Sequence, residues 1–150
     1  MKRILIATDG SPSALEALEC GLDLAAEHDA AVTFTYVVPA VDVYPTGGFG
    51  LTGAVPHELT SADSEPLDDA LRLAEEADVS ARTVLLHGEP ADEIVAYADT
   101  IDADVIVVGS RGHGRLASAL LGSVSRAILR EARRPVLVVR GSRASADIAA

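Results

Sequence analysis

The sequence has little sulfur, few aromatic residues and no long apolar run. It contains one cysteine, one methionine and no tryptophan, and aromatic residues make up only 3% of it. A lone cysteine cannot form a disulfide within the chain, and Cys20 falls in a helical pattern typical of a small core residue. No apolar run approaches the roughly 20 residues of a membrane span, and the first residues show no signal-peptide layout. We therefore expect a cytoplasmic protein with no membrane-spanning segment.

Several motifs of known chemistry are also absent. There is no GxxxxGK[ST] loop, which excludes the usual NTPase site with its phosphate-binding lysine. The turn after the first predicted strand lacks GxGxxG, which argues against a dinucleotide-binding domain. The four histidines have no metal-ligand spacing to one another or to the cysteine. No arrangement of nucleophile and base stands out, so we predict no catalytic residues and no structural metal.

The charges are distributed unevenly along the chain. Residues 1–108 hold four basic and twenty-one acidic residues, whereas residues 109–143 hold eight arginines and only Glu131, within a net charge of −11. An acidic surface repels nucleic acid, so we expect no nucleic-acid partner, while a small anion could bind near the arginines. The acidic excess and the near absence of lysine also suggest a surface adapted to high salt.

Apolar patterns alternate between strand and helix along the chain. A length of 150 residues suits one domain, predicted over 1–141, with a short flexible tail at 142–150. Strands are predicted at 2–8, 31–38, 82–86, 104–108 and 136–139, and helices at 12–28, 66–77, 91–100 and 123–132. This alternation predicts an α/β fold with five parallel strands in one doubly wound sheet.

Residues 39–65 are the least readable segment. Three prolines and four glycines interrupt any helical or strand pattern there. We expect a long, irregular and flexible connection, because loops of this length are often lids or mobile segments.

The central candidate site is a loop that follows a run of β-branched residues at 105–108. Gly109, Gly112 and Gly122 allow the backbone to approach a ligand and to point N–H groups at it. The helix predicted to begin at Ser123 favours an anion at its start. The hydroxyls of Ser123 and Ser125 and the guanidinium of Arg111 add donors. An ordinary strand-to-helix connection remains the alternative interpretation.

Asp9 is a second candidate site residue. It follows the first strand at the edge where open α/β sheets bind ligands. Aspartate before glycine is also common in turns, so the residues alone leave both interpretations open.

The spacing of the loop glycines resembles a known signature. Gly109, two residues, Gly112, nine residues and Gly122-Ser123 are similar to the ATP-binding signature of the universal stress protein family. The resemblance extends from Lys2 to Arg140 and is weakest between 39 and 78. It includes Ala7-Thr8-Asp9-Gly10-Ser11, Gly88-Glu89-Pro90 and Arg134-Pro135-Val136-Leu137-Val138-Val139.

The resemblance implies a flavodoxin-like sheet, like that of the adenine-nucleotide alpha-hydrolases, with strand order 3-2-1-4-5. That order would bring Asp9 and the Gly109 loop to one crevice. The family's ligand is ATP or AMP, with Mg²⁺ or Mn²⁺ on the phosphates. Asp9 would lie near the ribose and the metal-bridged phosphates, and the backbone of Val37 would face the adenine. The phosphate and ribose cradle would comprise Gly109, Ser110, Arg111, Gly112, Gly122, Ser123, Val124 and Ser125.

The resemblance also implies a nucleotide-dependent regulator or sensor of the stress response, with a signalling partner that the sequence does not identify. We expect a homodimer through Val136–Val139, because this strand is predicted at an open sheet edge where the family usually dimerises. Three alternatives remain: a dimeric adaptor of the same fold that binds no nucleotide, a slow ATPase, and a flavin-binding relative. The scarcity of aromatic residues disfavours the last.

Overall fold

The structure is a computed structural model, and it describes residues 1–111 and 121–141. Its main sheet has five parallel strands in the order β5-β2-β1-β6-β7. Numbered along the chain among these five strands, the order is 3-2-1-4-5, so the predicted doubly wound α/β fold is confirmed. The strands are β1 (Arg3–Ala7), β2 (Ala31–Val38), β5 (Ala81–His87), β6 (Val105–Gly109) and β7 (Val136–Val139).

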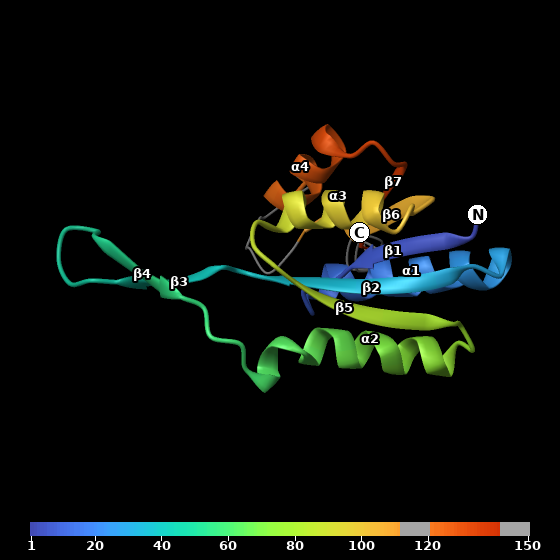
Figure 1. Ribbon diagram of the computed structural model, residues 1–150, viewed down its shortest axis with the longest axis horizontal. Helices are drawn as coiled ribbons and strands as arrows, with labels where there is room; N and C mark the ends of the chain where they lie inside the picture. The colour runs from blue at the N-terminus through green and yellow to red at the C-terminus, as the bar shows by residue number, and fades with distance from the viewer. Residues whose placement is uncertain (112–120, 142–150) are drawn as a thin grey trace, which may run out of the picture.

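Two helices cover each face of this sheet (Figure 1). They are α1 (Pro12–His28) and α2 (Glu65–Glu76) on one face, and α3 (Pro90–Thr100) and α4 (Ser123–Glu131) on the other. Ile4 and Ile6 of β1 pack with the first pair, whereas Leu5 between them packs with the second. Because the strand is buried on both faces, it carries consecutive apolar residues. Within the described part of the chain, no helix is long and apolar enough to cross a membrane.

The start of α1 follows directly from its sequence. The Ser11 hydroxyl accepts the N–H of Ala14 at 3.2 Å, and Pro12 occupies the first helical position. Both residue types are favoured there, because the first N–H groups of a helix have no partner within it. This turn places the end of β1 beside the first turn of α1.

The segment between β2 and α2 contains a hairpin, which corrects the prediction of an irregular connection over 39–65. Antiparallel strands β3 (Val41–Pro45) and β4 (Thr52–Pro56) project from the body, and a short 3₁₀ turn, η1 (Ser61–Asp63), precedes α2 (Figure 1). Both strands of a two-stranded ribbon are edges, where proline is tolerated, so Pro45 and Pro56 at the strand ends do not prevent pairing. We call residues 41–56 the arm.

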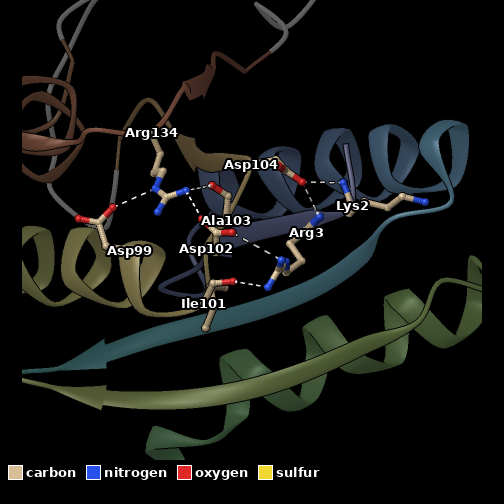
Figure 2. A network of polar contacts seen from close by, with 8 residues as sticks. All are labelled: Lys2, Arg3, Asp99, Ile101, Asp102, Ala103, Asp104 and Arg134. Atoms are coloured by element: carbon tan, nitrogen blue, oxygen red, sulfur yellow. Dashed lines mark hydrogen bonds and ion pairs between the residues drawn. The ribbon is translucent and has the colours of Figure 1, made fainter.

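Backbone N–H groups at the start of β1 are held by a carboxylate (Figure 2). Asp104 accepts the N–H of Lys2 at 2.6 Å and the N–H of Arg3 at 2.9 Å. These hydrogen bonds hold the pKa of Asp104 below its usual value. They join the amino end of β1 to the amino end of β6. The two neighbouring strands are thereby fixed relative to each other.

Arg134 lies in a second polar network near the amino ends of these strands. Its guanidinium donates to Asp99 at 2.9 Å and to Asp102 at 2.6 Å, and Arg3 makes a longer ion pair of 3.6 Å with Asp102 (Figure 2). The hydrogen bond that Arg134 donates to Asp99, followed by the one it donates to Asp102, raises the pKa of Arg134. The network links the end of α3 to the approach to β7.

Candidate functional site

A cavity of about 290 Å³ opens at the carboxyl ends of β1, β2 and β6. It lies at the point where the chain order reverses between β1 and β6, the usual ligand crevice of an open α/β sheet. The start of α4 and the start of α3 complete its wall. It is lined by Ala7, Thr8, Asp9, Ala14, Thr35, Tyr36, Val37, Pro90, Ile94, Val108, Gly109, Arg111, Gly122, Ser123, Val124 and Ser125.

The cavity brings together residues that are about a hundred positions apart in the sequence. Asp9 follows β1 and Gly109 ends β6, and both line this one space. The other predicted site residues in the lining are Val37, Arg111, Gly122, Ser123, Val124 and Ser125. The switch-point argument therefore located the crevice.

Among the described residues, the predicted site residue Ser110 does not line the cavity. Ser110 is buried, and its backbone joins neighbouring elements: its N–H donates to the carbonyl of Val139 at 2.9 Å, and its carbonyl accepts the N–H of Gly122 at 2.7 Å. Ser110 thus holds the two ends of the glycine loop together. Gly112 lies outside the described residues.

Gly109 is a glycine because helix α1 lies against it. A Cβ atom there would stand 2.6 Å from the carbonyl oxygen of Ser13 and 2.7 Å from its hydroxyl oxygen. The Ser13 hydroxyl also accepts the N–H of Arg111 at 3.2 Å. Ser13 therefore contacts both Gly109 and Arg111 at the start of the loop, and both of these residues line the cavity.

The first turn of α4 presents backbone N–H groups at the crevice. Gly122 is the capping residue and is buried, and because glycine has no side-chain oxygen, those N–H groups have no side-chain cap. N–H groups at a helix start, together with the positive end of the helix dipole, favour an anion. The wall formed by Gly122, Ser123 and Val124 is therefore suited to a phosphate.

Ser125 differs from its predicted role as a hydroxyl donor to a ligand. Its hydroxyl donates to the carbonyl of Gly109 at 2.7 Å, and the side chain is buried. A serine hydroxyl has one hydrogen, so that donor is already used. Ser125 instead ties α4 to the end of β6 and holds the helix start in place.

The turn interpretation of Asp9 is confirmed, and the residue also lines the cavity. One carboxylate oxygen accepts the N–H of Ser11 at 2.9 Å, which is the turn chemistry expected of aspartate before glycine. The same residue lines the cavity. The turn therefore fixes the carboxylate of Asp9 at the mouth of the crevice.

The register of β2 determines where the backbone of Val37 points. The carbonyl of Thr35 accepts the N–H of Thr8 on the β1 side, and the carbonyl of Val38 accepts the N–H of Gly88 on the β5 side. Successive residues of a strand direct their backbone groups to alternate sides. Val37 therefore turns its peptide groups toward β1, beyond the point where β1 ends, and toward the cavity.

Sequence reasoning missed several lining residues. Thr8, Thr35 and Tyr36 lie at the carboxyl ends of β1 and β2, and that position was the available signal. Burial raises the pKa of Tyr36, and the negative charges of Asp63 and Asp9 raise it further. Pro90 and Ile94, at the start of α3, add apolar wall, which could be placed only once the packing of α3 was known.

Residues that could hold a metal ion are few. In the parts of the chain described here, no group of three His, Cys, Asp or Glu side chains is arranged to bind one. Among the described residues that line the cavity, Asp9 provides the only carboxylate. A divalent cation in the crevice would therefore take most of its oxygen ligands from phosphates and water, as Mg²⁺ commonly does.

This fold and cavity define a doubly wound α/β protein with its ligand crevice at the switch point. The sequence matches the Universal stress protein family over residues 1–140, and the chain belongs to that family. It is 39% identical to Universal stress protein MJ0531 of Methanocaldococcus jannaschii over 142 residues, which cover 93% of this chain and 82% of the relative.

Two similar solved structures of universal stress proteins are complexes with adenine nucleotides. The universal stress protein from Archaeoglobus fulgidus in complex with dAMP has a TM-score of 0.67 at 25% identity, and the match covers 92% of this chain and 97% of that one. A universal stress protein in complex with cAMP has a TM-score of 0.69 at 26% identity, with coverage of 92% and 95%.

Proposed function

We propose that this protein binds ATP, or AMP, with Mg²⁺ or Mn²⁺ in the crevice between β1 and β6 and acts in the cytoplasm as a nucleotide-dependent regulator or sensor. The observation that carries the proposal is the convergence of Asp9, the peptide of Val37 and the start of α4 on one cavity. Related structures described with dAMP and cAMP support the choice of an adenine nucleotide.

Each part of the cavity suits a different part of the nucleotide. The N–H groups at Ser123 and Val124 would bind phosphate oxygens, and the guanidinium of Arg111 would add a positive charge. The backbone of Val37 would hydrogen-bond the edge of the adenine, while Val108 and Ile94 supply apolar wall. Asp9 would lie at the ribose and could reach a cation held by the phosphates. Such a cation would neutralise phosphate charge.

We further propose that two copies pair through β7. This strand is an edge of the sheet, bonded on one side to β6, and its side chains are partly exposed. The free side can accept a second strand. Sedimentation at high salt is expected to give a dimer, and a monomeric mass at micromolar concentration would contradict this part of the proposal.

We also propose that the acidic surface is an adaptation to high salt. The net charge of −11 causes self-repulsion that dissolved salt screens. Transfer to dilute buffer should then unfold the protein reversibly, with loss of its circular dichroism signal. Full stability in dilute buffer would exclude the adaptation.

The nucleotide proposal is tested by denaturing freshly purified protein and identifying the released small molecules by chromatography and mass spectrometry. The wild type should release ATP or AMP. Gly122→Leu should release none, because its side chain would occupy the buried helix start. Gly48→Leu is the matched control, since nothing lies within 4 Å of a Cβ at that position.

The outcomes of this experiment separate the alternatives. Absence of nucleotide, together with no binding of added ATP and Mg²⁺ at high salt, would favour a dimeric adaptor. Phosphate release above that of Gly122→Leu would indicate a slow ATPase. We expect at most slow turnover, since no base that could activate water stands out in the sequence.

A further inference from the structure

The arm is the most apolar exposed part of the described chain. Six of the thirteen large apolar side chains that are exposed in the described chain lie in the arm, between residues 41 and 56. Val43 is 66% exposed, Leu51 is 63% exposed, and Phe49 at the tip is fully exposed. Figure 1 shows the arm extending away from the sheet and its helices. Its apolar side chains therefore find little cover within their own chain.

The two faces of the arm differ. The antiparallel register places Val41, Val43 and Pro45 opposite Pro56, Ala54 and Thr52, so these six side chains share one face. On the other face Asp42 stands opposite Val55, and the ring of Tyr44 lies so close over Gly53 that a Cβ there would stand 2.6 Å from it. The tyrosine covers its own glycine, whereas the Val43 face is apolar and open.

The arm has a defined shape before any partner arrives. The N–H of Thr46 donates to the carbonyl of Leu51 at 3.0 Å near the tip, and the N–H of His57 donates to the carbonyl of Ala40 at 3.0 Å near the base. The His57 ring also contacts Asp42 at 2.8 Å and Asp63 at 3.2 Å. A preformed surface loses little conformational entropy on binding. A two-stranded ribbon is nevertheless only marginally stable alone, so it gains from a partner.

The charge distribution indicates which partner fits. The arm carries one charged residue, Asp42, and the chain has no lysine or arginine between Arg3 and Arg72. The arm therefore has no cation with which to bind an anionic lipid surface or an acidic peptide. Two copies of a chain with net charge −11 repel each other except where their surfaces are poor in charge, and the arm is such a surface.

We propose that the Val43 face of the arm packs against the same face of the arm of a second copy. Such a contact is related by a two-fold axis, so each residue meets its own counterpart or a near neighbour. Val43 pairs with Ala54 in the middle of the ribbon, and the two Val43 side chains would therefore lie near the axis. Two stacked ribbons form a small apolar layer that neither has alone.

The size of this face sets the strength of the contact. Five residues in each strand span only about 17 Å, so the buried area falls well short of the roughly 1,600 Å² of a standard interface. Arm pairing is therefore weak and concentration-dependent by itself. It would strengthen where a second contact, such as the proposed β7 pairing, raises the effective concentration of the arms.

The test compares the same substitution on opposite faces of one ribbon. In a Cys20→Ser background, Val43→Cys should form a disulfide between two copies under mild oxidation at least about tenfold faster than Val55→Cys, because only the first lies near the axis. Val43 and Val55 are 66% and 44% exposed, so both thiols are accessible. Reduced samples of both variants should sediment like the wild type.

A second measurement uses no cysteine. Val43→Glu should weaken the association that sedimentation at high salt measures as a rise of mass with concentration, and Val55→Glu should leave that association unchanged. Equal cross-linking at the two positions, or cross-linking at neither, would overturn the proposal. So would co-sedimentation with neutral phosphatidylcholine vesicles that suppresses the Val43→Cys disulfide, since that result would assign the face to lipid. Neither measurement depends on nucleotide binding.

Discussion

Gly109 lies so close to Ser13 that a single methyl group would not fit between them. The missing Cβ would stand 2.6 Å from the Ser13 carbonyl oxygen, which belongs to the backbone of α1 and cannot rotate away. Gly109→Ala should therefore displace α1 or the glycine loop and lower the free energy of unfolding by about 1–3 kcal/mol. Chemical denaturation at high salt measures the change.

Gly48→Ala is the control for that substitution. A Cβ at residue 48 has nothing within 4 Å, so its stability should stay within about 0.5 kcal/mol of the wild type. A Gly109→Ala protein as stable as Gly48→Ala would show that the contact with Ser13 relaxes without cost.

Ser125 should matter for stability although it was expected to serve a ligand. Ser125→Ala removes the donor to the carbonyl of Gly109 and leaves that oxygen without this partner, at a cost of about 1–3 kcal/mol. Ser123→Ala, at an exposed position in the same turn, should change the free energy of unfolding little. Denaturant titration of the two variants measures the difference. Equal losses in both would contradict the assignment.

His57, Asp42 and Asp63 form a hydrogen-bonded clasp at the base of the arm, and the stability of this clasp should depend on pH. His57 faces Asp42 with one ring nitrogen and Asp63 with the other, and a neutral imidazole has only one N–H to donate. The hydrogen bond to Asp42, then that to Asp63, raises the pKa of His57. The stabilisation that protonated His57 provides is therefore complete below its pKa in the unfolded chain, about 6.5. It is lost as the pH rises through the raised pKa of the folded protein.

At low pH the clasp is weakened because Asp63 becomes protonated. The N–H of Thr60, ahead of the His57 hydrogen bond, lowers the pKa of Asp63, so its contribution is lost as the pH falls through that lowered value. His57→Gln should consequently reduce the melting temperature near about pH 6 and have little effect near about pH 9. His28→Gln, at an exposed helix end, is the control. An effect of His57→Gln that is independent of pH would exclude the charged clasp.

The guanidinium of Arg134 should not be replaceable by an ammonium group. Arg134 reaches Asp99 and Asp102 with two different nitrogens, at 2.9 and 2.6 Å (Figure 2). Lysine has a single nitrogen and cannot reproduce this fork. Arg134→Lys should lower the melting temperature, whereas Arg130→Lys, at a more exposed pair with Glu131, should not. Equal melting temperatures for the two variants would contradict the prediction.

The sheet and the crevice could be predicted because their signals are local. Runs of β-branched residues located the strands, and the switch point of the family's strand order brought Asp9 to Gly109. The contact between Gly109 and Ser13 could not be predicted, because it joins residues far apart in the sequence through the packing of α1 on the sheet. The sequence shows glycine at 109 but not whether a ligand or a neighbouring helix requires it.

The arm was missed for a different reason. Pro45 and Pro56 argue against strands in a sheet interior, and the glycines between them argue against any regular element. In a two-stranded ribbon the two prolines fall at the strand ends and three of the glycines at the tip, while Gly53 pairs with Tyr44, whose ring covers it. The alternation of Val41 and Val43 was the signal for β3, but three residues are too few to outweigh the prolines.

The arm and the crevice wall belong to one continuous piece of chain. Val37 turns its peptide toward the cavity, β2 ends one residue later, and β3 begins at Val41. The segment from Val37 to Val41 is therefore a short connection between the cavity wall and the arm. If pairing of the arm shifts this segment, the reciprocity of linked equilibria requires that a ligand against the wall change the affinity of the arm for its partner by the same factor.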